Sequence, residues 1–136
     1  YTKNIYDLAR SHPKRLQAGS LEGKLCEVEA HIARVFERAA EAFKQGDEEL
    51  ARQVMEEYKE EVSTDCDDMA DDIITGKVSD LAAPEAAAVV LYARFLKRIG
   101  SHSRNIATSI VNPFHRIGYQ EKKRKEPETE IISPAE

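Results

Sequence analysis

The sequence has no tryptophan, only two cysteines and no long apolar run, and each of these absences excludes a class of protein. No stretch approaches the roughly 18 to 20 apolar residues that span a bilayer, and the first residues lack the basic-then-apolar pattern of a secretory signal. Cys26 and Cys66 are too few for a disulfide framework and lack the close pairing of a zinc site. We therefore expect a cytoplasmic protein in which both cysteines are small core residues.

Motifs of common catalytic and nucleic-acid sites are also missing. The chain has no glycine-rich phosphate loop, no nucleophile elbow and no Glu-x-x-His pair of a di-iron bundle. Its net charge is −5, and no basic stretch is interleaved with aromatic residues, which argues against direct nucleic-acid binding. We expect a regulatory or binding module, not an enzyme.

What is present is a helical pattern in a chain of 136 residues, the size of one domain with a single core. Apolar residues recur at spacings of three and four over about 20–45, 47–76 and 84–112, as in amphipathic helices. Gly46 suits the left-handed end of the first helix, and Asp47 suits the N-cap of the second. Short connections make neighbouring helices antiparallel, so the predicted fold is all-α, an antiparallel three-helix bundle.

The prediction assigns a role to each part of the chain. The bundle occupies 20–119, and the charged, proline-containing residues 120–136 form a mobile tail. The expected buried stripes are Leu21, Leu25, Val28, Ile32, Val35, Ala39 and Phe43; then Leu50, Val54, Tyr58, Val62, Cys66, Met69 and Ile73; and then Ala88, Tyr92, Phe95, Ile99, His102, Ile106 and Ile110.

The start of the chain resembles the end of the third helix. Residues 1–5 (Tyr-Thr-Lys-Asn-Ile) match residues 102–106 (His-Ser-Arg-Asn-Ile) as aromatic, hydroxyl, base, Asn and Ile, and a proline follows each segment. Together with a first residue other than Met, this match predicts that residues 1–12 are the end of the last helix of a preceding three-helix repeat.

Two further segments carry a family resemblance. Residues 97–106 read Lys-Arg-Ile-Gly-Ser-His-Ser-Arg-Asn-Ile, and residues 46–51 read Gly-Asp-Glu-Glu-Leu-Ala. They resemble the PhoU family of phosphate-uptake regulators, whose two three-helix repeats each end in a segment like Arg-Ile-Gly-Asp-His-x-x-Asn-Ile; the resemblance spans about 20–112. It implies a non-enzymatic, homo-oligomeric regulator, at most peripheral to the membrane, that contacts a phosphate-transporter ATPase or a sensor kinase.

The same resemblance bears on metal binding. In the family, Glu and Asp four residues apart on the last two helices bind iron or zinc clusters, because such side chains share one helix face. Here Lys97 and Ser101 stand at the third-helix positions. The second-helix positions are Tyr58 and Val62 without a gap, or Lys59 and Ser63 with one inserted residue. Since none of these pairs is a metal ligand set, we expect this repeat to have lost the cluster.

A metal site in another register stays open as an alternative. Glu61 with Asp65, and Asp68 with Asp72, have the spacing of two carboxylate pairs that could hold iron or a hard cation, and His102 could add a ligand. The simpler interpretation is a solvated acidic face and a hydrogen-bonded core histidine. A metal-binding bundle and a structural dimerisation module are therefore the rival functions.

Basic residues of the third helix are candidates for partner binding. Residues 47–72 hold twelve acidic residues against two basic ones, a balance of −10, whereas the third helix is basic. Arg94, Lys97, Arg98 and Arg104 could bind an anion or an acidic partner surface, or could pair with the acidic second helix.

The segment that follows the third helix has an unusual composition. Residues 112–119 read Asn-Pro-Phe-His-Arg-Ile-Gly-Tyr. We expect Phe114, Ile117 and Tyr119 to cover the end of the core; the alternative is that Phe114 and Arg116 dock a partner, since aromatic and arginine side chains anchor interfaces.

Overall fold

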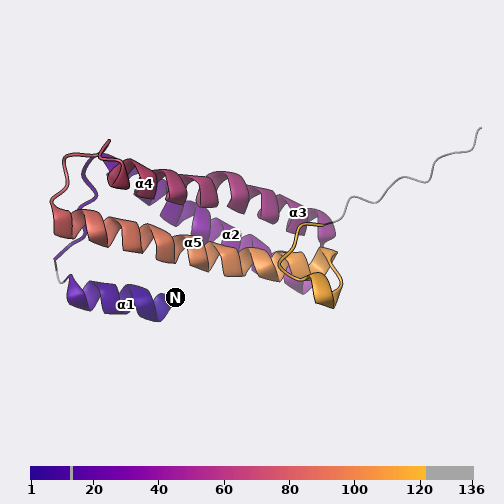
Figure 1. Cartoon of the computed structure of the whole chain (residues 1–136). Coiled ribbons are helices and arrows are strands. Elements are labelled where there is room, and N and C mark those ends of the chain that lie inside the picture. Colours follow the sequence, from indigo (N-terminus) through magenta and orange to yellow (C-terminus); the bar gives the residue numbers. More distant parts are fainter. Residues whose placement is uncertain (13, 122–136) are drawn as a thin grey trace, which may run out of the picture.

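The computed structural model describes residues 1–12 and 14–121, and within them every regular element is helical, which confirms the all-α prediction (Figure 1). The α-helices are α1 (Thr2–Ser11), α2 (Glu22–Gln45), α3 (Glu48–Glu57), α4 (Thr64–Ile74) and α5 (Ala83–Val111). Short 3₁₀ turns lie at Gly19–Leu21 and Phe114–Arg116. Within the described residues, no helix combines the length and apolar composition needed to cross a membrane.

The second predicted helix is a single rod with an irregular centre. Tyr58–Ser63 is a π-helical segment that joins α3 to α4 without a break. At its start, Gly46 has a φ of 66°, and the Asp47 carboxylate accepts a 2.9 Å hydrogen bond from the Leu50 N–H. Both predicted end signals are therefore confirmed, and they make the tight turn that lays this rod antiparallel to α2 (Figure 1).

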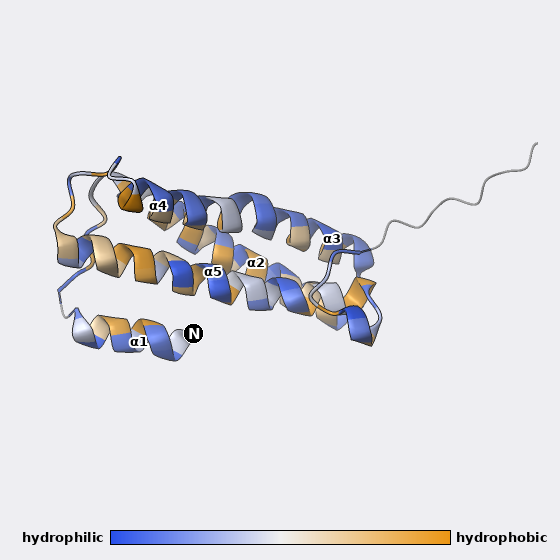
Figure 2. Ribbon diagram, in the orientation of Figure 1, coloured by the Kyte–Doolittle hydropathy of each residue, from blue (hydrophilic) through white to orange (hydrophobic). Residues whose placement is uncertain are grey.

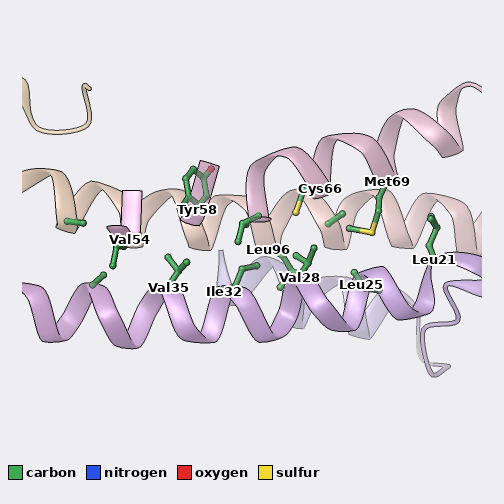
Figure 3. Close-up of a cluster of buried hydrophobic side chains, with 14 of the residues drawn as sticks. Leu21, Leu25, Val28, Ile32, Val35, Val54, Tyr58, Cys66, Met69 and Leu96 are labelled. Atoms are coloured by element: carbon green, nitrogen blue, oxygen red, sulfur yellow. The ribbon is translucent and has the colours of Figure 1, made fainter. Parts of the chain in front are cut away.

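The core lies between α2, the α3–α4 rod and α5 (Figure 3). The stripes predicted for the first two helices are mostly confirmed, with Val28, Val35 and Val54 fully buried. Two expectations are wrong. Phe43 is 61% exposed because Ala42 takes its place in the core, and Cys26 is exposed on α2 while Cys66 is buried.

The stripe predicted for the third helix is also wrong in part. The face of α5 that enters the core carries mostly small residues: Ala88, Val89, Ala93, Leu96, Gly100, Ser103, Ala107 and Thr108. The larger side chains Tyr92, Phe95 and Ile99 lie beside that face and are half-buried, whereas His102 and Ile106 are exposed. Small residues let α5 approach the other helices closely, and this leaves the bulkier stripe on its flank.

Helix α1 lies along that flank, antiparallel to α5 (Figure 1). Its Ile5 is half-buried against the core, but no residue of α1 is fully buried. The Tyr1 ring stacks on the His102 ring with 5.4 Å between centroids. His102 is thus an exposed surface residue covered by an aromatic ring, not the core histidine of the sequence-based interpretation.

The first two residues of the predicted tail are held against α3. Arg52 of α3 donates hydrogen bonds of 2.7 and 2.9 Å to the two carboxylate oxygens of Glu121, so residues 120 and 121 belong to the folded part. The rest of the predicted tail, residues 122–136, lies outside the described residues.

Candidate functional site

The continuous helix from α3 to α4, called the acidic rod below, carries negative charge that is neutralised chiefly by lysine and arginine side chains of α2. Hydrophilic residues dominate the outer side of α3 and α4 (Figure 2). From α2, the Lys24 ammonium lies 3.2 Å from Asp65 and 3.7 Å from Asp68, and Arg34 donates a 2.7 Å hydrogen bond to Glu61. Asp72 pairs at 2.9 Å with Lys77, beyond the end of α4.

A second cluster centres on a carboxylate that the sequence did not single out. Glu57 is the last residue of α3, and its side chain is only 9% exposed. Arg34 and Arg38 both donate to it, Arg38 at 2.6 Å, and Arg38 also donates to Gln53 at 2.7 Å. The hydrogen bond that Arg34 donates to Glu57 is the largest cause that raises the pKa of Arg34. These ion pairs fasten α2 to the acidic rod.

The predicted metal ligands do not converge. Each of Glu61, Asp65, Asp68 and Asp72 faces a lysine or arginine, and His102 is stacked on Tyr1. Among residues 1–12 and 14–121, no three His, Cys, Asp or Glu side chains are grouped so as to hold a metal ion. The acidic face carries ion pairs to lysine and arginine, where the simpler interpretation of the sequence had expected a solvated face.

The third-helix positions of the family motif meet the π-helical segment. A methyl group on Gly100 would lie 2.9 Å from two ring carbons of Tyr58 and 3.3 Å from Val62, so only glycine fits without movement. The Tyr58 hydroxyl donates a 3.3 Å hydrogen bond to the backbone oxygen of Lys97. The Lys97 ammonium in turn pairs with Asp67 of α4.

Comparison with protein families supplies the identity of this bundle. A model described as the PhoU domain matches residues 25–110, more than half of the chain. The chain belongs to the PhoU family. Comparisons with curated proteins and with solved structures found no match. The match covers most of α2, the whole acidic rod and nearly all of α5, which are the helices that build the core.

The side chains present do not fit the metal cluster that PhoU resemblance implies. Lys97 occupies one ligand position with a cation that is already paired with Asp67, and Ser101 offers a neutral hydroxyl at the other. The facing residues Tyr58 and Val62 are buried and apolar in their contact with Gly100. A bound metal needs deprotonated, anionic or imidazole ligands, so this PhoU bundle holds the two helices together by packing and an ion pair instead.

The other basic residues of α5 differ from Lys97 in how their charges are paired. Arg94 and Arg98 are exposed, and neither forms an ion pair with any residue that the structure describes. Arg104 donates a 3.1 Å hydrogen bond to the backbone oxygen of Gly118. The basic helix therefore does not neutralise the acidic rod, apart from Lys97, and Arg94 and Arg98 remain available at the surface.

The segment after α5 is held in place but does not cap the core. Buried Thr108 accepts a 2.7 Å hydrogen bond from the Gly118 N–H, and buried Asn112 donates a 2.9 Å bond to the backbone oxygen of Tyr119. Phe114 is nevertheless 90% exposed, and Tyr119 is 64% exposed with Arg116 over its ring at 5.6 Å. The predicted cap is therefore wrong for these aromatic side chains.

This loop, residues 112–119, combines exposed aromatic side chains with an anchored backbone. Buried polar side chains hold its backbone, so presenting Phe114 costs little ordering on binding. The aromatic residues and arginine were visible in the sequence, whereas the anchoring role of Thr108 and Asn112 was not. The spacing of polar residues along a helix does not mark the ones that hold a loop, so only the fold identifies Thr108 and Asn112.

Proposed function

We propose that this chain regulates phosphate uptake by non-enzymatic contact with a phosphate-transporter ATPase, a sensor kinase, or both. Membership in the PhoU family supports a role in the regulation of phosphate transport. The observation that carries the contact mechanism is Phe114, which is 90% exposed on a loop anchored by buried polar groups. Solvent-exposed aromatic residues on preorganised backbone are frequent anchors of protein interfaces.

The contact surface that we propose combines this loop with the outer face of α5. Arg94 and Arg98 lie on that helix without carboxylate partners in the described part of the chain. Arginine at a surface favours acidic partners through bidentate hydrogen bonds. Phe114 would supply the apolar anchor, and the arginines would supply orientation and salt-dependent attraction.

The domain organisation that we propose gives α1 the position of a neighbouring repeat. Tyr1 and His102 are the first residues of the two matching segments, and their rings are stacked where α1 lies beside α5. Equivalent residues meet in this way at a twofold axis between two similar units. This supports the interpretation of residues 1–12 as the end of the third helix of another repeat.

The experiment is affinity capture from phosphate-replete and phosphate-starved cells, followed by mass spectrometry. We expect recovery of a transporter ATPase or sensor kinase, reduced at least fivefold by Phe114→Ala. The matched control is Phe36→Ala, since Phe36 is 57% exposed but lies on α2. Equal recovery with both variants, or no phosphate-transport component in either growth condition, would contradict the proposal.

A further inference from the structure

A cavity of about 390 Å³ lies between α1, the segment that follows it, α2 and α5. This volume falls within the range of about 300–1,000 Å³ that is usual for small-molecule sites. The cavity is independent of the contact surface proposed above, because it lies at the opposite end of the bundle from the loop 112–119 (Figure 1).

The walls of the cavity are mainly apolar. Ile5 and Leu8 come from α1, Leu16 from the connecting segment, Leu25 from α2 and Ala88 from α5. None of the residues of α1 is fully buried, so its contact with the bundle is incomplete on this side. A second opening of about 290 Å³ lies beside Leu8, next to Phe95, so α1 is flanked by unfilled space.

One end of the cavity is basic. His12, Lys14 and Arg15 line it where the chain leaves α1. Lys14 forms no ion pair with a residue that the structure describes, and Arg15 reaches Glu22 only at 3.7 Å. Glu22 is also satisfied locally, because it accepts a 2.9 Å hydrogen bond from the Ala18 N–H. An anion at this end would meet the basic side chains of Lys14 and Arg15, and the nearby Glu22 carboxylate is held in place by the Ala18 N–H.

The other end is bordered by a hydrogen-bonded pair, Tyr92 and Glu29. The Tyr92 hydroxyl donates a 2.7 Å hydrogen bond to the Glu29 carboxylate, and burial, followed by this bond, raises the pKa of Tyr92. Glu22 and Glu29 are seven residues apart on α2, which is about 10 Å along the helix axis at 1.5 Å per residue. The cavity is thus a short slot with a basic entrance, apolar walls and a far end without a free donor.

We propose that this slot binds a medium-chain amphiphile with an anionic head group. Its carboxylate or phosphate would lie against Lys14 and Arg15, and its alkyl chain would run between Leu8 and Leu25 toward Tyr92. Such a ligand would fill the space under α1 and fasten that helix to the bundle. Ligand binding in the slot would therefore strengthen the packing of α1 against the bundle.

The cysteines provide a direct readout in the full chain. Cys26 lines the slot and is exposed, whereas Cys66 is buried in the core. Burial raises the pKa of Cys66 to about 12, so its thiol is unreactive at neutral pH. Alkylation by iodoacetamide, followed by mass spectrometry, then reports the accessibility of Cys26 alone.

The test titrates decanoate, decyl phosphate and the neutral decanol, each below its micelle concentration, and measures binding by calorimetry and the alkylation rate of Cys26. We expect saturable binding of both anions, at least tenfold tighter than decanol, with the alkylation of Cys26 slowed at least tenfold at saturation. Tight binding of one anion alone would show which head group, carboxylate or phosphate, the slot selects.

Two variants probe the two ends of the slot. Lys14→Gln with Arg15→Gln should reduce the affinity for the anions to that for decanol, while Lys44→Gln, on the exposed end of α2, should leave it unchanged. Cys26→Trp should fill the slot and abolish binding, whereas Ala30→Trp, on an exposed position of the same helix, should not. Equal affinity for anions and decanol, or binding that survives Cys26→Trp in a folded protein, would overturn the proposal.

Discussion

The contact between Gly100 and Tyr58 predicts opposite effects for the same substitution at two helical glycines. Gly100→Ala places a methyl group 2.9 Å from the Tyr58 ring, and such overpacking costs about 1–3 kcal/mol. Alanine regains about 1 kcal/mol of helix propensity, so the free energy of unfolding should fall by roughly 0–2 kcal/mol. Gly23→Ala in the first turn of α2 meets no atom within 4 Å and should be neutral or stabilising by up to about 1 kcal/mol.

Urea denaturation and thermal unfolding of the two variants measure this difference. At this chain length 1 kcal/mol corresponds to about 4 °C in the melting temperature, so a gap of about 1–3 kcal/mol between the variants is resolvable. The added cost of Gly100→Ala should largely disappear when Tyr58→Leu removes the ring, because the two residues are in contact. If Gly100→Ala stabilises the protein as much as Gly23→Ala does, the close approach of α5 to the π-helical segment is refuted.

Further predictions concern a helix cap, an acid-sensitive turn and the two thiols. Asp47→Ala should lower the free energy of unfolding in urea by about 1 kcal/mol because α3 loses its N-cap, whereas Glu49→Ala should change it far less. The backbone N–H and the hydroxyl of Ser20 donate hydrogen bonds to the Asp80 carboxylate, and they hold the pKa of Asp80 below its usual 3.8. The stability that Asp80 contributes is therefore present above about pH 4 and lost as pH falls through the folded pKa, and Asp80→Asn should flatten the acid limb of the stability profile. In the native protein, alkylation at pH 8 should modify Cys26 and spare Cys66; equal modification of both would show that the core opens readily.

The ends of the helices could be predicted from the sequence because they depend on local chemistry. Gly46 and Asp47 act through their own backbone and side chain, and both have the predicted conformation. The π-helical segment was not predicted, although the sequence carries a signal for it. Val54, Tyr58, Val62 and Cys66 are buried at three successive spacings of four, and in an α-helix each such step rotates the side chain by about 40° from the previous one. A wider turn between Tyr58 and Ser63 keeps these side chains in the core.

The buried face of α5 could not be chosen by periodicity alone. The helix has a stripe of small residues and an adjacent stripe that includes Tyr92, Phe95 and Ile99, and both repeat with helical spacing. The larger residues would bury more apolar area per side chain, so the sequence analysis assigned them to the core. In the folded bundle, close approach of the helices favours Ala93 and Gly100 instead, and α1 covers the larger stripe only in part.

The pairing of charges decides which surface a partner can use. Lys24 and Arg34, which the sequence analysis did not single out, neutralise the acidic rod from α2, because pairing across helices depends on their relative rotation. Arg94 and Arg98 form no ion pair with a carboxylate among the described residues. If these arginines attract the partner, association should slow as salt shortens the Debye length from about 10 Å at 0.1 M. Arg94→Gln with Arg98→Gln should remove most of that salt dependence, while Phe114→Ala should weaken binding at every salt concentration; a salt dependence unchanged by the arginine variant would place the electrostatic contact elsewhere than on α5.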